Sequence, residues 1–192
     1  VVLLAGARAM TVKGAILCTH FGLSGPTILN CAGEVADLLH QGTVTAHIDT
    51  HPQKDIGTLD AFLVQIFDVH KNKSLKNVWN DIAPIGTGPA LLPLLPSIDP
   101  DIKIHSITKE QRRQIVDLLK ALPVTITGLM GYDRAVIADG GLALTEVDTR
   151  TMRSKKYSNL YVTGDLLHIS RPSGGYSLQL CWTTGFVAAD HA

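Results

Sequence analysis

The spacing of apolar residues changes period several times along the chain, and each change predicts a new element. Short apolar runs and strict alternation indicate strands, whereas apolar residues at i, i+3, i+4 and i+7 indicate one face of a helix. The helical spacing is clearest where Leu59, Phe62 and Ile66 share a face. The predicted strands are residues 1–4, 11–18, 43–49, 124–129, 135–141 and 160–163, and the predicted helices are residues 24–41, 59–69, 74–79, 91–95, 108–122 and 174–189.

Residue types that begin or end helices stand at several predicted boundaries. Ser24 is the expected N-cap of the first helix, and Gly42 is its expected end. Thr108, with Gln111 three residues later, predicts a capping box, and Pro123 is expected to end that helix. Strands come first, helices follow, and the chain closes with further strands and one strand–helix unit. This order predicts an α+β module followed by the tail of an α/β domain.

Composition and charge narrow the class of protein. Hydrophobic residues make up 45% of the 192, enough for a core, and the formal net charge is zero with scattered basic residues. We therefore expect no nucleic-acid partner, although zero net charge leaves room for a local basic patch. The three cysteines are too sparse for a disulfide framework and no apolar run is long enough for a membrane span, so we expect a cytoplasmic protein without a membrane partner. The chain starts without Met inside a predicted strand, and we expect it to be part of a longer protein.

The first fifty residues hold two candidate sites that each have a simpler structural reading. Residues 22–26 look like a nucleophile elbow, but that motif needs glycine where Pro26 stands, so Ser24 is better explained as a helix cap. Four side chains with metal-binding atoms lie in the same region: Cys18, His20, His47 and His51. Their spacing does not match a structural zinc site, and we predict no metal. For His20, both a structural role and a substrate contact stay open.

The segment between the last predicted strand and the last predicted helix carries a stronger candidate site. The strand ends at Gly164–Asp165, which places a carboxylate at the sheet edge where open α/β sheets bind ligands. Ser173 is the expected cap of the helix, and the backbone N–H groups of Gly174, Gly175 and Tyr176 lie at its positive end. The two glycines let a ligand approach the backbone closely, but a plain loop-to-helix turn explains them equally well.

Two stretches of the chain together resemble one family of bacterial flavoproteins. They are "KGAILCTHFGLSGPTIL" near the amino terminus and "ADGGLALTEVDTRTMRSKKYSNLYVTGDLL…SGGYSLQLCWTTG" near the carboxy terminus. They resemble the YhiN-type family, also called BaiN-like, of NAD(P)/FAD-dependent oxidoreductases. The fold of that family is a Rossmann-like FAD domain with an inserted β-barrel and helical part. Between residues 49 and 122 the likeness is limited to helical character.

The resemblance implies a fold class for the whole chain. The implied fold is α+β, a β-barrel-like insertion with a helical subdomain, followed by the carboxy-terminal strand–helix unit of a Rossmann-like FAD domain. The family's Gly-Gly pair matches Gly140–Gly141, and its Thr-Met-x-Ser-Lys motif matches Thr151, Met152, Ser154 and Lys155. The implied segments are residues 1–53 for the first strands and helix of the insertion domain, 54–121 for the helical subdomain, 122–140 for the return strands of the insertion domain and 141–192 for the carboxy-terminal part of the FAD domain.

The resemblance also implies which residues contact the cofactor FAD. The implied cofactor-binding set is Gly164, Asp165, Ser173, Gly174, Gly175 and Tyr176. The first two would lie on the ribityl or pyrophosphate side, and the last three would bring a helix N-terminus to the pyrimidine edge of the flavin. The Gly-x-Gly-x-x-Gly turn of dinucleotide sites is not in the sequence, so we expect these 192 residues to bind FAD weakly or not at all by themselves. NAD(P)H is a candidate second cofactor.

The chain departs from the family pattern in the loop before the glycine pair. The family often has Asp-x-Asp-Gly-Tyr-Thr there, where this chain has residues 168–173 with Arg171, and it often has Asn where this chain has Ser177. These departures leave the substrate and the flavin potential open.

The function implied by the resemblance is the carboxy-terminal part of an FAD-dependent oxidoreductase that acts on a small molecule. The alternative is a non-catalytic ligand- or partner-binding module derived from a flavoprotein. No residue is assigned as catalytic, and Tyr176, His168 and His20 are the candidates for an acid or base. The sequence does not indicate an oligomeric state.

Overall fold

The elements indicated by the sequence are arranged in two compact units, each built from two separate stretches of chain. The fold is described from a computed structural model, which covers residues 2–5, 10–136 and 140–192. The first unit combines Val1–Lys13 with Gln41–Thr127, and the second combines Gly14–His40 with Gly128–Ala192. Over the described residues the protein is a mixed α/β structure with six α-helices and small antiparallel sheets.

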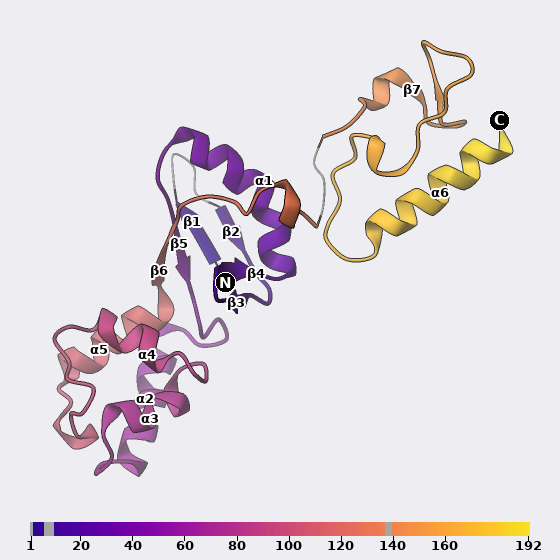
Figure 1. The fold of residues 1–192 in the computed structure, drawn as a ribbon. Coiled ribbons are helices and arrows are strands. Elements are labelled where there is room, and N and C mark those ends of the chain that lie inside the picture. Colours follow the sequence, from indigo (N-terminus) through magenta and orange to yellow (C-terminus); the bar gives the residue numbers. More distant parts are fainter. Residues whose placement is uncertain (1, 6–9, 137–139) are drawn as a thin grey trace. The chain divides into compact units, whose positions relative to one another are not determined.

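A four-stranded antiparallel sheet forms the framework of the first unit (Figure 1). In spatial order its strands are β2 (Met10–Val12), β1 (Val2–Ala5), β5 (Val44–Ile48) and β6 (Leu122–Ile126). Val44 pairs with Ile126, so stretches far apart in the sequence form one ladder. Pro123, which was expected to end a helix, lies in β6 opposite His47. An edge strand tolerates proline because the missing N–H can face away from the ladder.

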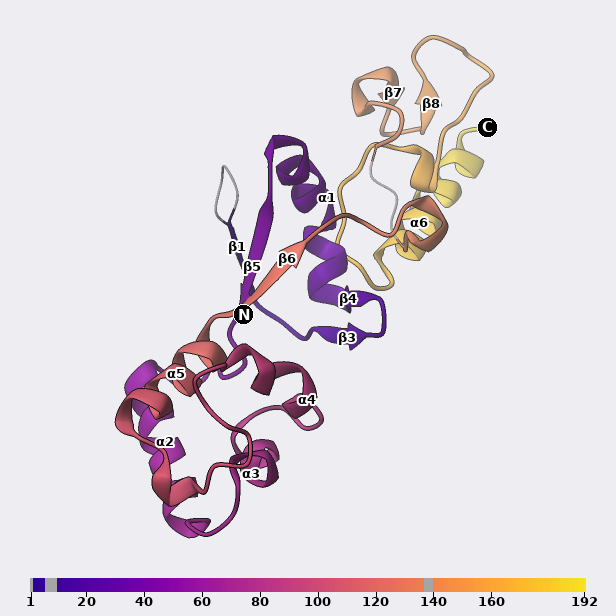
Figure 2. The same cartoon turned by 60° about the vertical axis from the view of Figure 1, so that its left-hand side comes forward.

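Four α-helices gather at the end of β5 and β6 and enclose an apolar core (Figures 1 and 2). They are α2 (Ile56–Val69), α3 (Leu75–Ile82), α4 (Gly88–Leu91) and α5 (Lys109–Lys120). Trp79 lies in this core with 1% of its surface exposed, and its indole N–H donates to Thr87 Oγ1 at 3.1 Å. The predicted capping box of Thr108 and Gln111 is present at the start of α5. Helical periodicity in the sequence therefore identifies the helices α2 and α5 correctly.

Lys120 joins the helical subdomain to the sheet. Its ammonium group donates to Asp49 Oδ2 at 2.5 Å and to two backbone carbonyl oxygens of the loop after β5 at 2.6 and 3.2 Å. The backbone N–H and the hydroxyl of Thr50 both donate to Leu119 O at 2.9 Å. Burial and the nearby lysine charges lower the pKa of His51 in the same corner. These contacts hold the end of β5 against the end of α5.

The second unit joins an amino-terminal hairpin and helix to the carboxy-terminal segment. Its elements are β3 (Leu17–Thr19), β4 (Gly22–Ser24), α1 (Pro26–Gln41), β7 (Val147–Asp148), β8 (Arg153–Ser154) and α6 (Tyr176–Asp190). Short 3-10 helices occur at Tyr132–Arg134, Leu144–Glu146 and Gly164–Leu166 in this unit, and at Leu92–Leu94 and Ile104–Ser106 in the first. A small core in its carboxy-terminal part consists of Val147, Met152, Val162, Leu167 and Ala188.

Two amino-terminal predictions are wrong in detail. The predicted strand at residues 11–18 is two strands, because Gly14 bends the chain with a φ of 154° and the halves belong to different units. Ser24 does not cap α1, because it lies in β4 opposite Leu17. Gly25, with a φ of 98°, then turns the chain into the helix, which begins at Pro26.

The predicted strand at residues 160–163 is also wrong. The segment pairs with β8 only through an isolated antiparallel bridge between Tyr161 and Arg153, flanked by hydrogen bonds from Ser154 N–H to Leu160 O at 2.8 Å and from Val162 N–H to Met152 O at 2.9 Å. This pairing is too short to form a strand. The predicted strand at residues 135–141 includes residues 137–139, which lie outside the described residues, and its described part is not a strand. Of the predicted strand–helix unit, the described residues therefore contain the helix α6 without the strand.

The larger divisions of the chain are less simple than the sequence suggests. The described strands form open sheets, and β2 and β6 are the two edges of the largest one. A barrel-like insertion therefore stays a prediction. The boundaries at residues 53, 121 and 140 also stay predictions, since each compact unit draws on both halves of the chain.

Candidate functional site

The start of α6 is open at the predicted glycine pair. Gly174 has a φ of 110°, a conformation that favours glycine, whereas Gly175 is the N-cap with an ordinary φ of −69°. Apart from its neighbours in the chain, no described residue places a heavy atom within 4 Å of the position that a Cβ on Gly175 would occupy. No side chain caps the helix, so its first N–H groups lack that partner. Backbone conformation explains the glycine at 174, but neither conformation nor packing within the described residues explains the glycine at 175.

Arg171 ties the Gly164–Leu166 turn to the first turn of α6. Its side chain is only 6% exposed. It donates from Nη2 to Asp165 Oδ1, from Nη1 to Ile169 O at 2.7 Å and from Nε to Ser177 Oγ at 2.8 Å. All three nitrogens therefore have an acceptor, while half-exposed Asp165 keeps Oδ2 without a hydrogen bond from the described residues. Arg171 and Ser177 stood out in the sequence only as departures from the family pattern, and they bond to each other.

Two glycines of the predicted motifs are explained by close packing. Gly164 has a φ of 60°, and a Cβ there would lie 2.7 Å from Cys181 Sγ in α6. Its N–H donates to Thr184 Oγ1 at 2.9 Å, which anchors the turn on the helix. Gly141 has a φ of 122°, and a Cβ there would lie 2.7 Å from Leu166 O. A cofactor contact for Gly164 stays a prediction, because packing alone requires glycine at this position.

Ser173 connects α1 with the loop before α6. Its N–H donates to Asn30 Oδ1 at 2.6 Å and its hydroxyl donates to Pro26 O at 3.4 Å, across 143 and 147 residues of sequence. The prediction that Ser173 caps α6 is wrong, because Gly175 is the N-cap and the hydroxyl is directed to α1. The contact brings together the two stretches that carry the family resemblance. Nothing in the sequence pattern singles out Asn30 for this role.

The three candidate acids or bases are exposed and do not form a cluster. Tyr176 is 59% exposed, and both His20 and His168 are exposed. The His20 ring makes an edge contact with Phe21, with 4.9 Å between ring centroids. None of the three candidates forms a hydrogen bond to another in the described part of the chain. Tyr176 alone belongs to the open end of α6.

The helix α6 exposes apolar side chains that the sequence pattern predicts to be buried. Leu178, Cys181 and Trp182 lie at i, i+3 and i+4, a spacing that predicts a buried helix face, but Leu178 and Trp182 are 59% and 67% exposed, and Phe186 is 74% exposed. Thr184 and Ala188 are the buried residues of the helix. The prediction of a wide buried face is therefore wrong for Leu178 and Trp182, because the helix buries only the narrow side that faces the Gly164–Leu166 turn.

The Thr-Met-x-Ser-Lys motif builds the turn between β7 and β8. Met152 is buried with a φ of 61°, and its N–H donates to Asp148 O at 2.7 Å. Ser154 Oγ accepts the N–H groups two and three residues later, both at 3.2 Å. Lys155 Nζ donates to Thr145 O at 2.9 Å. Local geometry thus accounts for this motif without a ligand.

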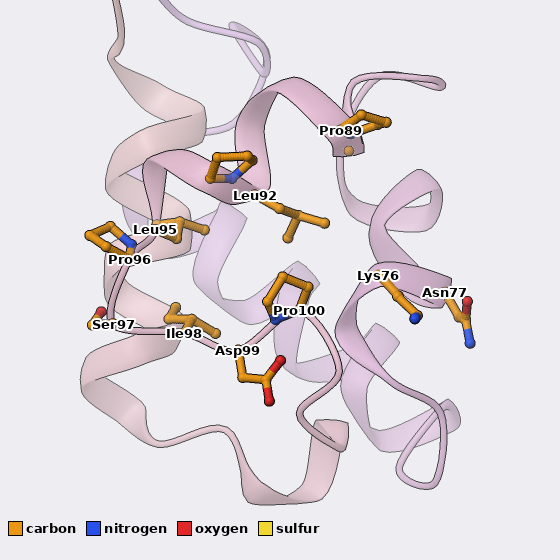
Figure 3. Close-up of a pocket in the computed structure, with 12 residues that line it drawn as sticks. Lys76, Asn77, Pro89, Leu92, Leu95, Pro96, Ser97, Ile98, Asp99 and Pro100 are labelled. Carbon is orange, nitrogen blue, oxygen red and sulfur yellow. The ribbon is translucent and has the colours of Figure 1, made fainter.

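A cavity of about 730 Å³ lies in the helical subdomain (Figure 3). Leu92, Leu95 and Ile98 contribute apolar side chains, and Lys76 and Asn77 of α3 contribute polar ones. None of the predicted cofactor-binding residues lines this cavity. In the described residues no group of three or more His, Cys, Asp or Glu side chains is placed to hold a metal ion. No helix in the same residues is long and apolar enough to cross a membrane.

Comparison with known proteins identifies a family for this chain. Residues 1–137 match the profile of a family described as HI0933-like protein barrel and H2TH domain. The chain belongs to this HI0933-like family. The matched residues include β1 to β6 and α1 to α5, whereas β7, β8 and α6 lie beyond the match.

Curated relatives resemble nearly the whole chain. A protein of Escherichia coli (strain K12) named ribosomal RNA dihydrouridine synthase is 28% identical over 176 residues, which are 91% of this chain and 41% of that protein. A protein of Clostridium scindens named 3-dehydro-bile acid delta(4,6)-reductase is 27% identical over 180 residues, 91% of this chain and 43% of that protein. A Haemophilus influenzae protein, also named ribosomal RNA dihydrouridine synthase, is 26% identical over 174 residues, with 91% and 41% covered. The chain thus spans less than half the length of these relatives.

Proposed function

We propose that this chain is the carboxy-terminal part of an FAD-dependent oxidoreductase. On this proposal it supplies the flavin-ring side of the cofactor site together with a substrate-binding domain, and NAD(P)H is the source of reducing equivalents. Family membership and the names of the relatives support oxidoreductase chemistry, and the sequence resemblance supports FAD. The names fit the resemblance to oxidoreductases, because one names an enzyme that makes a reduced product, dihydrouridine, and the other names a reductase.

The open N-terminus of α6 is the observation that carries the proposal. Gly175 has an ordinary backbone conformation and empty space around its missing side chain, so its own fold does not require glycine. A ligand that approaches the backbone closely does require it. The neighbouring N–H groups are uncapped and lie at the positive end of the helix dipole.

The residues at this end of α6 fit an FAD molecule. FAD, when bound, supplies hydride transfer at its flavin ring. The uncapped N–H groups suit an electron-rich edge of the ring, because pre-oriented donors stabilise negative charge. Asp165 keeps one carboxylate oxygen for a hydroxyl donor while Arg171 holds the other. The Gly-x-Gly-x-x-Gly turn is not in the 192 residues, and the relatives are more than twice as long, so we place the rest of the site outside this chain.

The names of the relatives suggest the reaction class. Dihydrouridine is uridine with two added hydrogens, and a delta(4,6)-reductase adds hydrogen to a bile-acid derivative. We propose addition of a hydride and a proton across a carbon–carbon double bond that is polarised by a carbonyl group. Tyr176 is the proposed proton donor, because its exposed phenol stands at the open end of the helix. The N-terminal dipole of α6 would then stabilise the phenolate that remains.

The substrate class that follows is wider than the one expected from the sequence alone. The sequence indicated a small molecule, and the bile-acid reductase agrees with that expectation. Two relatives named for ribosomal RNA extend the proposal to a nucleic-acid base. A non-catalytic binding module remains the alternative function, and it differs from an oxidoreductase in having no redox cofactor.

Flavin content of the full-length gene product tests the proposal. We expect about one FAD per chain, released on denaturation and bleached by NADPH or NADH without oxygen. Tyr176→Phe should leave that bleaching unchanged and slow substrate reduction by about 10²-fold or more, the usual size of a general-acid effect. A colourless protein that does not bind added FAD would support the binding-module alternative instead.

A further inference from the structure

Positive charge in the second unit is concentrated on one hairpin. The second unit contains six Lys and Arg residues, and four of these six fall within the seven residues 150–156. No Asp or Glu occurs from Thr149 to Gly164. We call residues 150–157, which include β8, the basic hairpin. Its cations are Arg150, Arg153, Lys155 and Lys156.

The four cations of the basic hairpin are exposed, and the nearest acidic residue in the β7–β8 ladder is Asp148, opposite Arg153. None of its four cations forms an ion pair with a carboxylate in the described part of the chain. Arg153 Nη2 donates to Tyr161 OH at 2.6 Å, and Lys155 Nζ donates to Thr145 O at 2.9 Å. Both acceptors are neutral, so they fix the positions of two cations without cancelling their charge. Two of the four cations are therefore held in position by hydrogen bonds to neutral groups.

An aromatic side chain lies within the basic hairpin. Tyr157 is 53% exposed, and Lys156 Nζ lies 5.4 Å from its ring centroid. Cations hold the phosphates of single-stranded nucleic acids while aromatic rings stack on their bases. The basic hairpin combines both features in adjacent residues.

The basic hairpin is suited to an extended polyanion rather than to a compact ligand. Small organic substrates need a concave site, and the cavity of the helical subdomain is lined by no residue of the hairpin. Separated cations on an open surface can each contact a different phosphate along a backbone. The zero net charge of the chain, which favoured no nucleic-acid partner, sums over all residues, whereas phosphates respond to charges within about 10 Å at 0.1 M salt.

We propose that the basic hairpin binds the sugar–phosphate backbone of an RNA, with Tyr157 stacking on one of its bases. This inference rests on the proposed function, because an enzyme that reduces a base within RNA must also hold the flanking chain. It replaces the expectation that the protein has no nucleic-acid partner.

Fluorescence anisotropy with a labelled oligouridine of about 16 nucleotides tests the inference on the full-length protein. The test variant is Arg150→Gln with Lys156→Gln, because neither side chain forms a hydrogen bond or ion pair in the described structure. The matched control is Lys73→Gln with Lys103→Gln, two exposed lysines of the helical subdomain that also form no ion pair there. Each double variant removes the same charge.

The hairpin variant should bind the oligouridine roughly 25-fold more weakly at 0.1 M salt, and its salt slope should fall by about 1.4, since each phosphate contact contributes about 0.7 for a single strand. The control should bind within about twofold of the unchanged protein. Tyr157→Ala should weaken binding by about tenfold while Tyr157→Phe retains it, because stacking needs the ring and not the hydroxyl.

Three results would overturn the inference. They are an equal loss in both double variants, no binding by the unchanged protein, and tighter hairpin-dependent binding to phosphatidylserine vesicles than to RNA. Flavin content of the same samples separates this inference from the proposed function. A yellow protein without RNA binding contradicts only the hairpin, whereas a colourless protein that binds RNA through the hairpin contradicts only the flavin.

Discussion

Gly174 and Gly175 are adjacent glycines with different physical causes. Gly174 has a positive φ that other residues rarely adopt, so its identity is set by the backbone. Gly175 has an ordinary φ and free space around it, so its identity points to something outside the described residues. The sequence shows both as one Gly-Gly motif and cannot separate them, because φ depends on the final path of the loop. The structure therefore makes Gly175 the better probe for a ligand.

Arg171 holds the candidate site together through three hydrogen bonds, a role that the sequence did not indicate. Removing it leaves the acceptors Asp165, Ile169 O and Ser177 without their donor. Arg171→Leu should therefore lower the free energy of unfolding by about 1–3 kcal/mol, with Arg171→Lys in between because an ammonium group cannot reach all three. Urea unfolding followed by circular dichroism measures the change.

The control for this prediction is Arg150→Leu. Arg150 is exposed and its side chain forms no hydrogen bond in the described residues, so its loss should change the free energy of unfolding by less than about 0.5 kcal/mol. Equal effects of the two substitutions would show that the Arg171 network does not stabilise the fold.

Elements that depend on local sequence were predicted well, and elements that depend on distant partners were not. Apolar periodicity and the Thr108–Gln111 capping box identify α2 and α5, since both signals act within a few residues. The predicted strand at residues 160–163 fails because a strand needs a ladder, which local pattern does not supply. The helix before Pro123 ends at Lys120, as predicted, but the place of Pro123 inside β6 was not predicted, because only the pairing of β6 at a sheet edge makes a proline acceptable there.

The junction between β5 and α5 predicts a pH dependence of stability. The pKa of His51 is lowered from 6.5 by burial, with smaller effects of Lys54 and Lys120, and the Asp49 charge opposes them. The unfolded chain therefore binds a proton at His51 more readily than the folded chain. Stability from this residue is complete above about pH 6.5 and is lost as the pH falls below that value. The variant His51→Asn, whose amide can bond to Thr50, should lack this loss.

Urea unfolding at pH 7.5, 6 and 5 measures the effect on the free energy of unfolding. The difference in free energy of unfolding between the unchanged protein and His51→Asn should become smaller as the pH is lowered, since only the unchanged protein loses stability at this residue. Parallel pH profiles for the two proteins would contradict the lowered pKa.

At the scale of the whole molecule, the sequence indicated the fold class but not which stretches of the chain pack together into one unit. Order of elements and family resemblance gave a mixed α and β chain with a helical subdomain, and both are present. The pairing of Gly14–His40 with Gly128–Ala192 in one unit was not predicted, because it depends on contacts such as Ser173 with Asn30 across 143 residues. Motifs in the sequence named the candidate cofactor residues. Only the structure shows that Gly164 is closely packed, that Gly174 has a positive φ and that Gly175 faces open space.

The claim that the open end of α6 faces a flavin is tested most directly by FAD affinity in two glycine variants of the full-length protein. Gly175→Ala places a methyl group in space that the described residues leave empty, and Gly185→Ala makes the same change later in α6, also with no atom within 4 Å. Both variants should stay folded by circular dichroism, and Gly185→Ala should gain up to about 1 kcal/mol of stability. We expect Gly175→Ala to bind FAD at least about tenfold more weakly and Gly185→Ala to bind it normally, because only the first methyl group meets the cofactor. A folded Gly175→Ala protein with unchanged FAD affinity would contradict the account.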